Sequence, residues 1–224
     1  MLNITKTIAP SADQWMIVIE GMRNPMNSWA NIDSNVENEK IDVGDADNHR
    51  MLSLAKGGPV HAKYRRMLPV IFTVEAPLYW WKEFETYRTG IAPNPTDIEM
   101  NSCSTMHRVM EHEFTMADFS TDHMLKEAKE NMQRHIDELN YYRSCYIDWK
   151  AKKHMDLAND YWYTLIQRLP SNYHQKRTIS ANYEALSAMY KWRHDHKLEE
   201  WHTFCDWIKT LPHSEIITLE EISV

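Results

Sequence analysis

An arginine near the C-terminus is the residue best suited to chemistry in this chain. Arg193 follows a candidate strand at Lys176–Ala181 and a candidate helix at Tyr183–Trp192. A guanidinium donates hydrogen bonds in a planar fork, so it can hold a phosphate or the O–C–N edge of a uracil-like ring through two bonds. The alternative is a surface arginine that pairs with the acids following it, such as Asp195 and Glu199. The spacing alone leaves both interpretations open.

Two other places combine reactive residue types. His107 and Glu111 stand four positions apart, a spacing that suits a metal on one face of a helix. Two ligands are too few for a stable site, so we predict no bound metal and a hydrogen bond at a helix surface instead. Cys103 precedes Ser104. A nucleophilic cysteine needs a base or a cation to lower its pKa, and we do not expect Cys103 to be catalytic.

Basic residues gather at two points that could bind a phosphate. Lys63, Arg65 and Arg66 follow His61, and Lys176-Arg177 begins the candidate strand near the C-terminus. Charge runs are usually solvated faces, so a phosphate site and a solvated basic edge remain equally open at this stage.

Composition excludes several classes of protein. Net charge is −7, which argues against a duplex nucleic-acid binder. Only five glycines occur and there is no G-x-G-x-x-G or Walker-type loop, which argues against Rossmann and P-loop phosphate sites. No apolar run approaches the ~20 residues that cross a bilayer, and no signal peptide is evident. Three cysteines without a CxxC pair indicate reduced thiols, so we expect a cytoplasmic protein.

Hydrophobic periodicity predicts the elements that must position these residues. Strands are expected at Gln14–Glu20, Leu68–Ala76 and Lys176–Ala181. Helices are expected at Asp45–Lys56, Leu78–Tyr87, Asn101–Phe114, Thr121–Asp148, Leu157–Leu169, Tyr183–Trp192 and Leu198–Leu211. We expect Asp45 or Asp47 to be the N-cap of the first helix, and we expect loops at Arg23–Asp47 and Thr89–Met100. The order predicts an α+β fold with few strands, in one domain spanning residues 1–224.

Specific residues near the C-terminus resemble a known family. Leu169-Pro170 is followed by Asn182 and, eleven positions later, by Arg193. This pattern is similar to the flavin-dependent thymidylate synthases, whose fold is a small, mostly antiparallel sheet with long packed helices. In that family the arginine binds and polarises the pyrimidine of dUMP, and the asparagine lies beside the flavin. The resemblance therefore implies a catalytic and substrate-binding role for Arg193 and a cofactor-binding role for Asn182.

A second block, His61–Arg88, resembles the stretch that leads into the family's R-H-R signature. Arg88 matches the last arginine of that signature, and Ser104 matches a serine that contacts dUMP. The resemblance implies that Arg88 and Ser104 bind substrate. It also implies cofactor contacts from His61 and from His196, one of the histidines that flank Arg193.

The chain departs from the family at several of these positions. The first two residues of the signature are Thr86 and Tyr87, and a histidine that touches flavin is replaced by Met67. Glu83 stands where the family has a glutamine that contacts nucleotide, and Glu184 stands where it has an arginine that contacts substrate. Each glutamate would repel a phosphate in a low-dielectric pocket unless a cation neutralises it.

The resemblance implies an activity and its partners. We expect methylation of dUMP to dTMP with FAD, NADPH and methylenetetrahydrofolate, in a homotetramer whose active sites form between subunits. The departures favour an alternative, a non-catalytic or re-purposed member of the same fold that binds a pyrimidine nucleotide. A third hypothesis is a module for protein interaction without a ligand, because a fold does not fix a function.

Overall fold

The computed structural model describes residues 2–87 and 98–219, which form two compact units. Unit 1 contains Glu75–Lys82 and Ser102–Arg177, and unit 2 contains the other described residues. Arg88 and most of the loop expected at Thr89–Met100 lie outside the described residues. A single domain over residues 1–224 stays a prediction.

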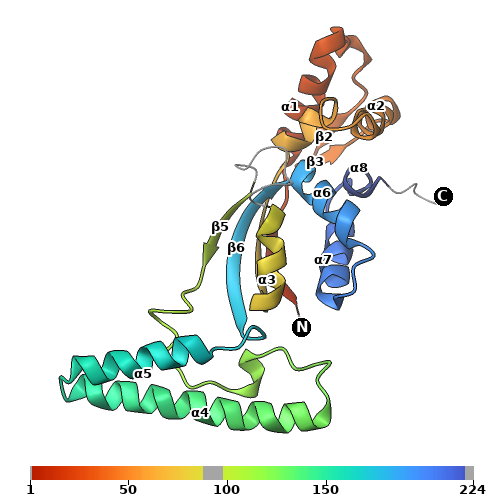
Figure 1. The fold of residues 1–224 in the computed structure, drawn as a ribbon. Helices are drawn as coiled ribbons and strands as arrows, with labels where there is room; N and C mark the ends of the chain where they lie inside the picture. The colour runs from red at the N-terminus through yellow and green to blue at the C-terminus, as the bar shows by residue number, and fades with distance from the viewer. Residues whose placement is uncertain (1, 88–97, 220–224) are drawn as a thin grey trace. The chain divides into compact units, whose positions relative to one another are not determined.

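The main sheet has four strands in the order β1 (Asn3–Ile8), β4 (Pro69–Pro77), β6 (His174–Asn182) and β5 (Glu99–Ser102). Strands β4 and β6 are antiparallel: the start of β4 lies opposite the end of β6, and the end of β4 lies opposite the start of β6. The amide of Tyr183 donates to the carbonyl of Leu68, and the amide of Leu78 donates to that of Tyr173. A separate antiparallel hairpin joins β2 (Asn35–Glu37) to β3 (Lys40–Asp42). The fold is α+β with a small antiparallel sheet and long helices, as predicted (Figure 1).

The two strands predicted around β4 and β6 are confirmed within two residues at each end. Their side chains alternate between buried and more exposed, the pattern of a sheet with one covered face. On β4 the buried positions are Val70, Phe72, Val74 and Ala76.

The strand expected at Gln14–Glu20 is wrong, because this segment lies in helix α1 (Ala12–Arg23). Ser11 caps the helix in a reciprocal capping box: its Oγ accepts from the amide of Gln14, and its amide donates to the Gln14 side chain. The buried residues are Trp15, Val18, Ile19 and Met22, which follow helical spacing. The run of apolar residues concealed this period at the sequence level.

Helix α2 (Asp45–Lys56) has the predicted bounds but not the predicted cap. Its N-cap is Gly44, and the first amides of the helix donate to Asp33, a residue from the preceding loop: Ala46 to Oδ2 and Asp47 to Oδ1. These hydrogen bonds, first that from Ala46, lower the pKa of Asp33. A Cβ at position 44 would lie 2.2 Å from Asp33 Cγ, so only glycine permits this close approach.

The remaining helices come before and after the two long strands. A 3-10 helix, η3 (Ala62–Met67), precedes β4, and α3 (Leu78–Phe84), most of which belongs to unit 1, follows it. Helices α6 (Tyr183–Arg193) and α7 (Glu199–Lys209) confirm the predicted pair, and a short α8 (Glu215–Thr218) packs on α6. The helix predicted at Leu78–Tyr87 is shorter than expected.

Unit 1 is built on two long helices, α4 (Lys126–Ala151) and α5 (Met155–Arg168), which lie side by side (Figure 1). On α4, Met132, Ile136 and Leu139 are buried, whereas Leu125, just before the helix, is exposed. The helix predicted at Asn101–Phe114 is wrong. Strand β5 occupies its start, and the Asn140 side chain hydrogen-bonds both the amide and the carbonyl of Phe114, which keeps that backbone out of a helix.

Across residues 2–87 and 98–219, no helix combines the length and apolar character that a membrane span requires.

The capping box of α1 predicts a measurable loss of stability. Ser11→Ala removes the side-chain acceptor for the Gln14 amide and should lower the free energy of unfolding by about 1 kcal/mol in urea titrations. Ser53→Ala, on the exposed face of α2, is the matched control and should be neutral or slightly stabilising. Equal effects of the two substitutions would contradict the cap.

Candidate functional site

Arg193 ends α6 and pairs with the carboxylate of Glu83 on α3. Its Nη1 lies 3.1 Å from Glu83 Oε2. The indole Nε1 of Trp201 donates to the same oxygen at 2.9 Å. His196 Nε2 lies 3.5 Å from it. Three nitrogen atoms therefore lie around one carboxylate oxygen, and the indole of Trp201 donates a hydrogen bond to it. The surface-pair alternative predicted that Arg193 would pair with Asp195 or Glu199, whereas its ion-pair partner is Glu83.

Two aromatic rings fix the guanidinium of Arg193. Its carbon lies 5.3 Å from the ring centroid of Tyr87 and 4.9 Å from that of Trp201. Both rings are buried, and the arginine side chain is 17% exposed. Burial raises the pKa of Tyr87, and the nearby Arg193 opposes that shift. The two cation–π contacts fix the orientation of the guanidinium against the buried rings.

The tautomer of His196 follows from its two neighbours. The amide of Leu198 donates to His196 Nδ1 at 3.2 Å, so Nδ1 is an acceptor in this arrangement. The ring proton of a neutral imidazole then resides on Nε2, which faces Glu83. His196 therefore has the N–H side of its ring towards Glu83, at 3.5 Å from Oε2. Its predicted contact with a cofactor stays a prediction.

Asn182, at the other end of α6, caps the helix. Its Oδ1 accepts the amide of Ala185 at 2.9 Å, and the residue is 7% exposed. The structure thus gives Asn182 a structural role that the resemblance did not require. Its predicted contact with flavin stays a prediction.

Glu184 is neutralised by a buried cation. Arg65 Nε donates to Glu184 Oε2 at 2.7 Å, and Nη2 lies 2.5 Å from the same oxygen. Arg65 Nη1 also donates to Ser187 Oγ and to the carbonyl of Ile216. Because all of these groups are buried, Arg65 is not available to bind a phosphate, and the role considered for it from sequence is wrong.

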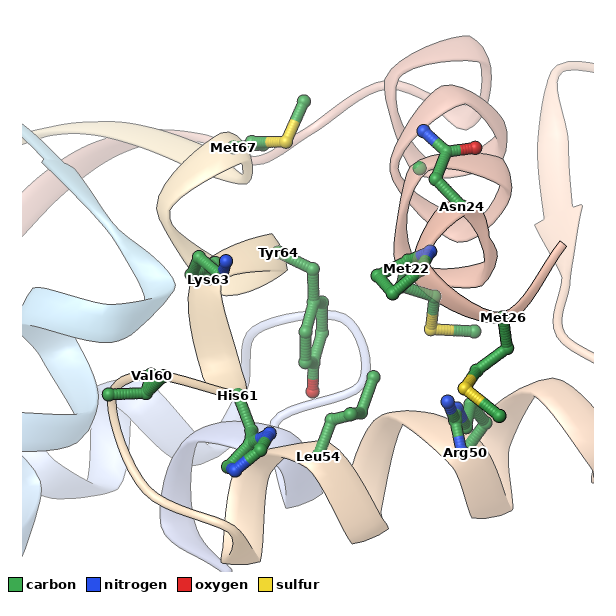
Figure 2. A pocket seen from close by; sticks show the side chains of 12 residues that line it. Met22, Asn24, Met26, Arg50, Leu54, Val60, His61, Lys63, Tyr64 and Met67 are labelled. Carbon is green, nitrogen blue, oxygen red and sulfur yellow. The ribbon is translucent and has the colours of Figure 1, made fainter.

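His61 lines a cavity of about 690 Å³ in unit 2 (Figure 2). Tyr64 projects from η3 into the middle of this cavity and donates to the carbonyl of Met51. The apolar wall comes from three helices: Met22 of α1, Leu54 of α2 and Met67 of η3. We call this the His61 cavity.

Two further cations, Lys63 and Arg50, line the His61 cavity. Lys63 is exposed at the rim. Arg50 Nε is buried and has no hydrogen-bond partner among residues 2–87 and 98–219. The guanidinium of Arg50 carries further N–H donors at the cavity wall, which an anionic or polar ligand could accept. No motif in the sequence indicated Arg50.

Ser104 belongs to unit 1, whereas His61, Asn182, Arg193 and His196 belong to unit 2. It is exposed, and its Oγ accepts the amides of Met106 and His107, which closes a tight turn. Glu111 pairs with Arg108 rather than with His107. Within the described part of the chain, no three histidines, cysteines or acids are placed to hold a metal.

The structure brings together only some of the predicted site residues. Arg193 and His196 share Glu83, whereas His61 lines its own cavity. Trp201, which sequence reasoning missed, supplies both a donor to Glu83 and a surface for Arg193. In the sequence, Trp201 is an aromatic residue eight positions after Arg193. That observation alone predicts a buried helix face and not a contact with Arg193.

The sequence matches no known protein family and no curated protein. Solved structures do match. Flavin-dependent thymidylate synthase ThyX from Helicobacter pylori, complexed with FAD and dUMP, aligns with a TM-score of 0.61 and 13% identity over 98% of this chain and 97% of that one. A second structure of Thymidylate Synthase X from Helicobacter pylori, with FAD and dUMP, gives a TM-score of 0.64 and 14% identity over the same shares.

This chain has the ThyX fold. The likeness extends over nearly the whole length of both chains, so the resemblance noted in two blocks of sequence covers one continuous architecture. At this identity the likeness concerns the fold, and the side chains described above decide what the ThyX-like site of this chain can bind.

The buried ion pair of Arg65 and Glu184 predicts a large effect of removing one partner. Arg65→Met should lower the free energy of unfolding by about 3–5 kcal/mol, because Glu184 is left buried without a cation. Lys63→Met, on the same 3-10 helix but exposed, should change it by less than about 0.5 kcal/mol. Chemical denaturation of both variants measures the difference, and similar values would show that the pair is not a structural requirement.

Proposed function

We propose that this chain is a ThyX-like flavoprotein that binds FAD and a pyrimidine deoxynucleotide and methylates dUMP to dTMP. The observation that supports it most is the fold likeness over 98% of the chain to structures that hold FAD and dUMP. Arg193 supports it further, because the sequence resemblance assigns this position to the arginine that binds the pyrimidine, and two aromatic rings fix its guanidinium.

The His61 cavity fits a phosphorylated aromatic cofactor such as FAD. Its volume of about 690 Å³ lies within the usual range for such sites, roughly 300–1,000 Å³. Met22, Leu54 and Tyr64 offer apolar contacts to a ring system, and Lys63 and Arg50 offer donors to a pyrophosphate. The positive charge of Arg50 at the cavity wall is the feature that favours an anionic ligand there.

The protein groups in this proposal bind and polarise. Bound FAD would supply the redox chemistry, with NADPH as reductant and methylenetetrahydrofolate as one-carbon donor. Arg193 would donate to the pyrimidine and stabilise the negative charge that develops on its ring. Arg88 and Ser104 would contact the rest of the nucleotide. The proposal includes a homotetramer in the cytoplasm, as the resemblance implies.

A second candidate function is a re-purposed nucleotide-binding member of the same fold. The observation that favours it is the contact between Arg193 and Glu83, since the arginine already has an anionic partner. A uracil would have to compete with that carboxylate for the same donors.

The proposal predicts that purified full-length protein retains added FAD. After desalting, the visible flavin absorbance should remain with the protein fraction. Arg50→Ala should weaken FAD binding about tenfold or more, since an anion would lose a charge-assisted donor. Arg108→Ala, an exposed arginine in unit 1, is the matched control and should leave the FAD affinity unchanged. Protein that never takes up FAD would refute the flavoprotein.

Removal of the Arg193 guanidinium tests the nucleotide site separately. Arg193→Ala should weaken dUMP binding about tenfold to a hundredfold, as expected for hydrogen bonds from a charged donor. Arg193→Lys should fall between, because an ammonium lacks the planar fork. Isothermal titration with dUMP measures the affinities. Lys191→Ala, an exposed cation on the same helix, is the control, and an Arg193→Ala affinity equal to it would exclude Arg193 from the site.

A further inference from the structure

The distal half of the α4–α5 hairpin has almost no core of its own. In the proximal half, Met132, Ile136 and Leu139 of α4 pack with Leu165 of α5 in a buried cluster. From residue 143 to residue 164, a stretch that the structure describes throughout, Ala158 is the one buried residue. Helices in proteins gain most of their stability by packing an apolar face against another element. This part of the hairpin therefore has apolar surface left to cover.

That apolar surface forms a stripe on each helix. On α4, Tyr141, Cys145 and Trp149 follow one another at four-residue intervals, so they lie on the same side of the helix. On α5, Leu157 and Tyr161 have the same spacing. Each helix therefore presents its own apolar stripe along the distal half of the hairpin.

Ring contacts place the two stripes on one side of the hairpin, whose helices lie side by side (Figure 1). The ring centroids of Tyr141 and Tyr142 are 5.8 Å apart, and those of Tyr142 and Tyr161 are 6.5 Å apart. The Tyr141 hydroxyl also lies near Cys145 and Tyr161. The surface shared by the two helices, which we call the aromatic face, consists of Tyr141, Tyr142, Cys145, Trp149, Leu157 and Tyr161.

The aromatic face is open to solvent in a single chain. Tyr141 is 58% exposed and Leu157 is 42% exposed, and the other four members are half-buried. A stable interface needs roughly 500 Å² from each partner, and a buried aromatic side chain contributes about 150–250 Å². The exposed parts of four rings and a leucine together are on that scale.

The charges around the aromatic face favour a second copy of this chain as the partner that covers it. Residues 141–165 contain four cations and three acids, so this stretch is nearly neutral, whereas the whole chain carries −7. At the proximal end, Glu138 and Arg168 form an ion pair. Two identical copies can therefore meet here without the repulsion expected between their other surfaces, as a two-fold interface requires. A nucleic acid would instead require a clear excess of cations.

We propose that two copies of this chain pair through the aromatic face and form a four-helix bundle around a two-fold axis. Helices α4 and α5 of one copy pack on those of the other, and the rings of both copies fill the core of the bundle. The inference does not rest on the proposed ligands. It names the surface for one contact of the homotetramer that the proposed function includes.

Sedimentation velocity of full-length protein over a micromolar concentration range tests the pairing. Wild type should sediment as a dimer or a larger even-numbered assembly. Tyr141→Glu and Leu157→Glu, singly and together, should raise the Kd of association about a hundredfold or more, because each places like charges in an apolar contact. Met106→Glu is the matched control: it adds the same charge at an exposed apolar residue of unit 1 outside the aromatic face, and should sediment as wild type.

Cysteine labelling tests where the contact lies. Cys145 is half-buried on the aromatic face, whereas Cys103 is exposed elsewhere in unit 1. In the wild-type assembly, maleimide followed by mass spectrometry should modify Cys103 and spare Cys145. Leu157→Glu, a substitution on the other helix, should open Cys145 to the reagent.

Three results would overturn the interface. They are a wild-type monomer at every concentration, an assembly that both glutamate variants leave unchanged, and labelling of Cys145 as fast as Cys103 in the assembly. Circular dichroism adds a fourth: Tyr141 and Leu157 are exposed in a single chain, so a loss of helix in their variants would mean that they pack within the chain. FAD uptake is measured separately. Paired but colourless protein refutes the flavoprotein and leaves the interface intact, and unpaired yellow protein does the reverse.

Discussion

A buried carboxylate needs a cation, and the pairing of Glu184 with Arg65 meets that requirement at the centre of unit 2. Arg65 belongs to η3, Glu184 and Ser187 to α6, and the carbonyl of Ile216 to α8, so one guanidinium joins three elements. Either charge alone would be strongly destabilising at this depth. The pair therefore fixes where α6 lies, and the two ends of α6 are where the candidate site residues stand.

The same requirement operates at the C-terminal end of α6 with a different result. Arg193 meets Glu83 at a partly exposed position, where the carboxylate keeps one oxygen without a partner in the described part of the chain. Glu184 is buried in its ion pair with Arg65, whereas Glu83 is partly exposed beside Arg193. Both glutamates depart from the family pattern, but they differ in burial. The buried Glu184 stabilises the fold with Arg65, and the partly exposed Glu83 pairs with Arg193 at the surface.

The strands β4 and β6 and the helix α6 could be predicted from the sequence because their apolar residues follow a local period. The cap of α2 could not, since Asp33 comes from a loop rather than from the helix. Glu83 and Arg193 were both noticed, but nothing local predicts that residues so distant in sequence meet. Helix α1 was not predicted, because the strand at Gln14–Glu20 was inferred from its apolar residues alone, without the capping pair of Ser11 and Gln14.

Under the proposed function, a few polar side chains rather than the fold would decide which ligand this chain binds. The wall of the His61 cavity is mainly apolar, and apolar contacts place few demands on the chemistry of a ring. Under this proposal, selectivity would instead depend on a few polar groups, such as the guanidinium of Arg50 in the cavity and the pair of Arg193 and Glu83. An incorrect ligand would leave such a polar group without a hydrogen-bond partner or facing a like group. The free-energy cost of this is larger than the gain from one more apolar contact. Substitution of one acceptor for one donor therefore alters the ligand far more than it alters the fold.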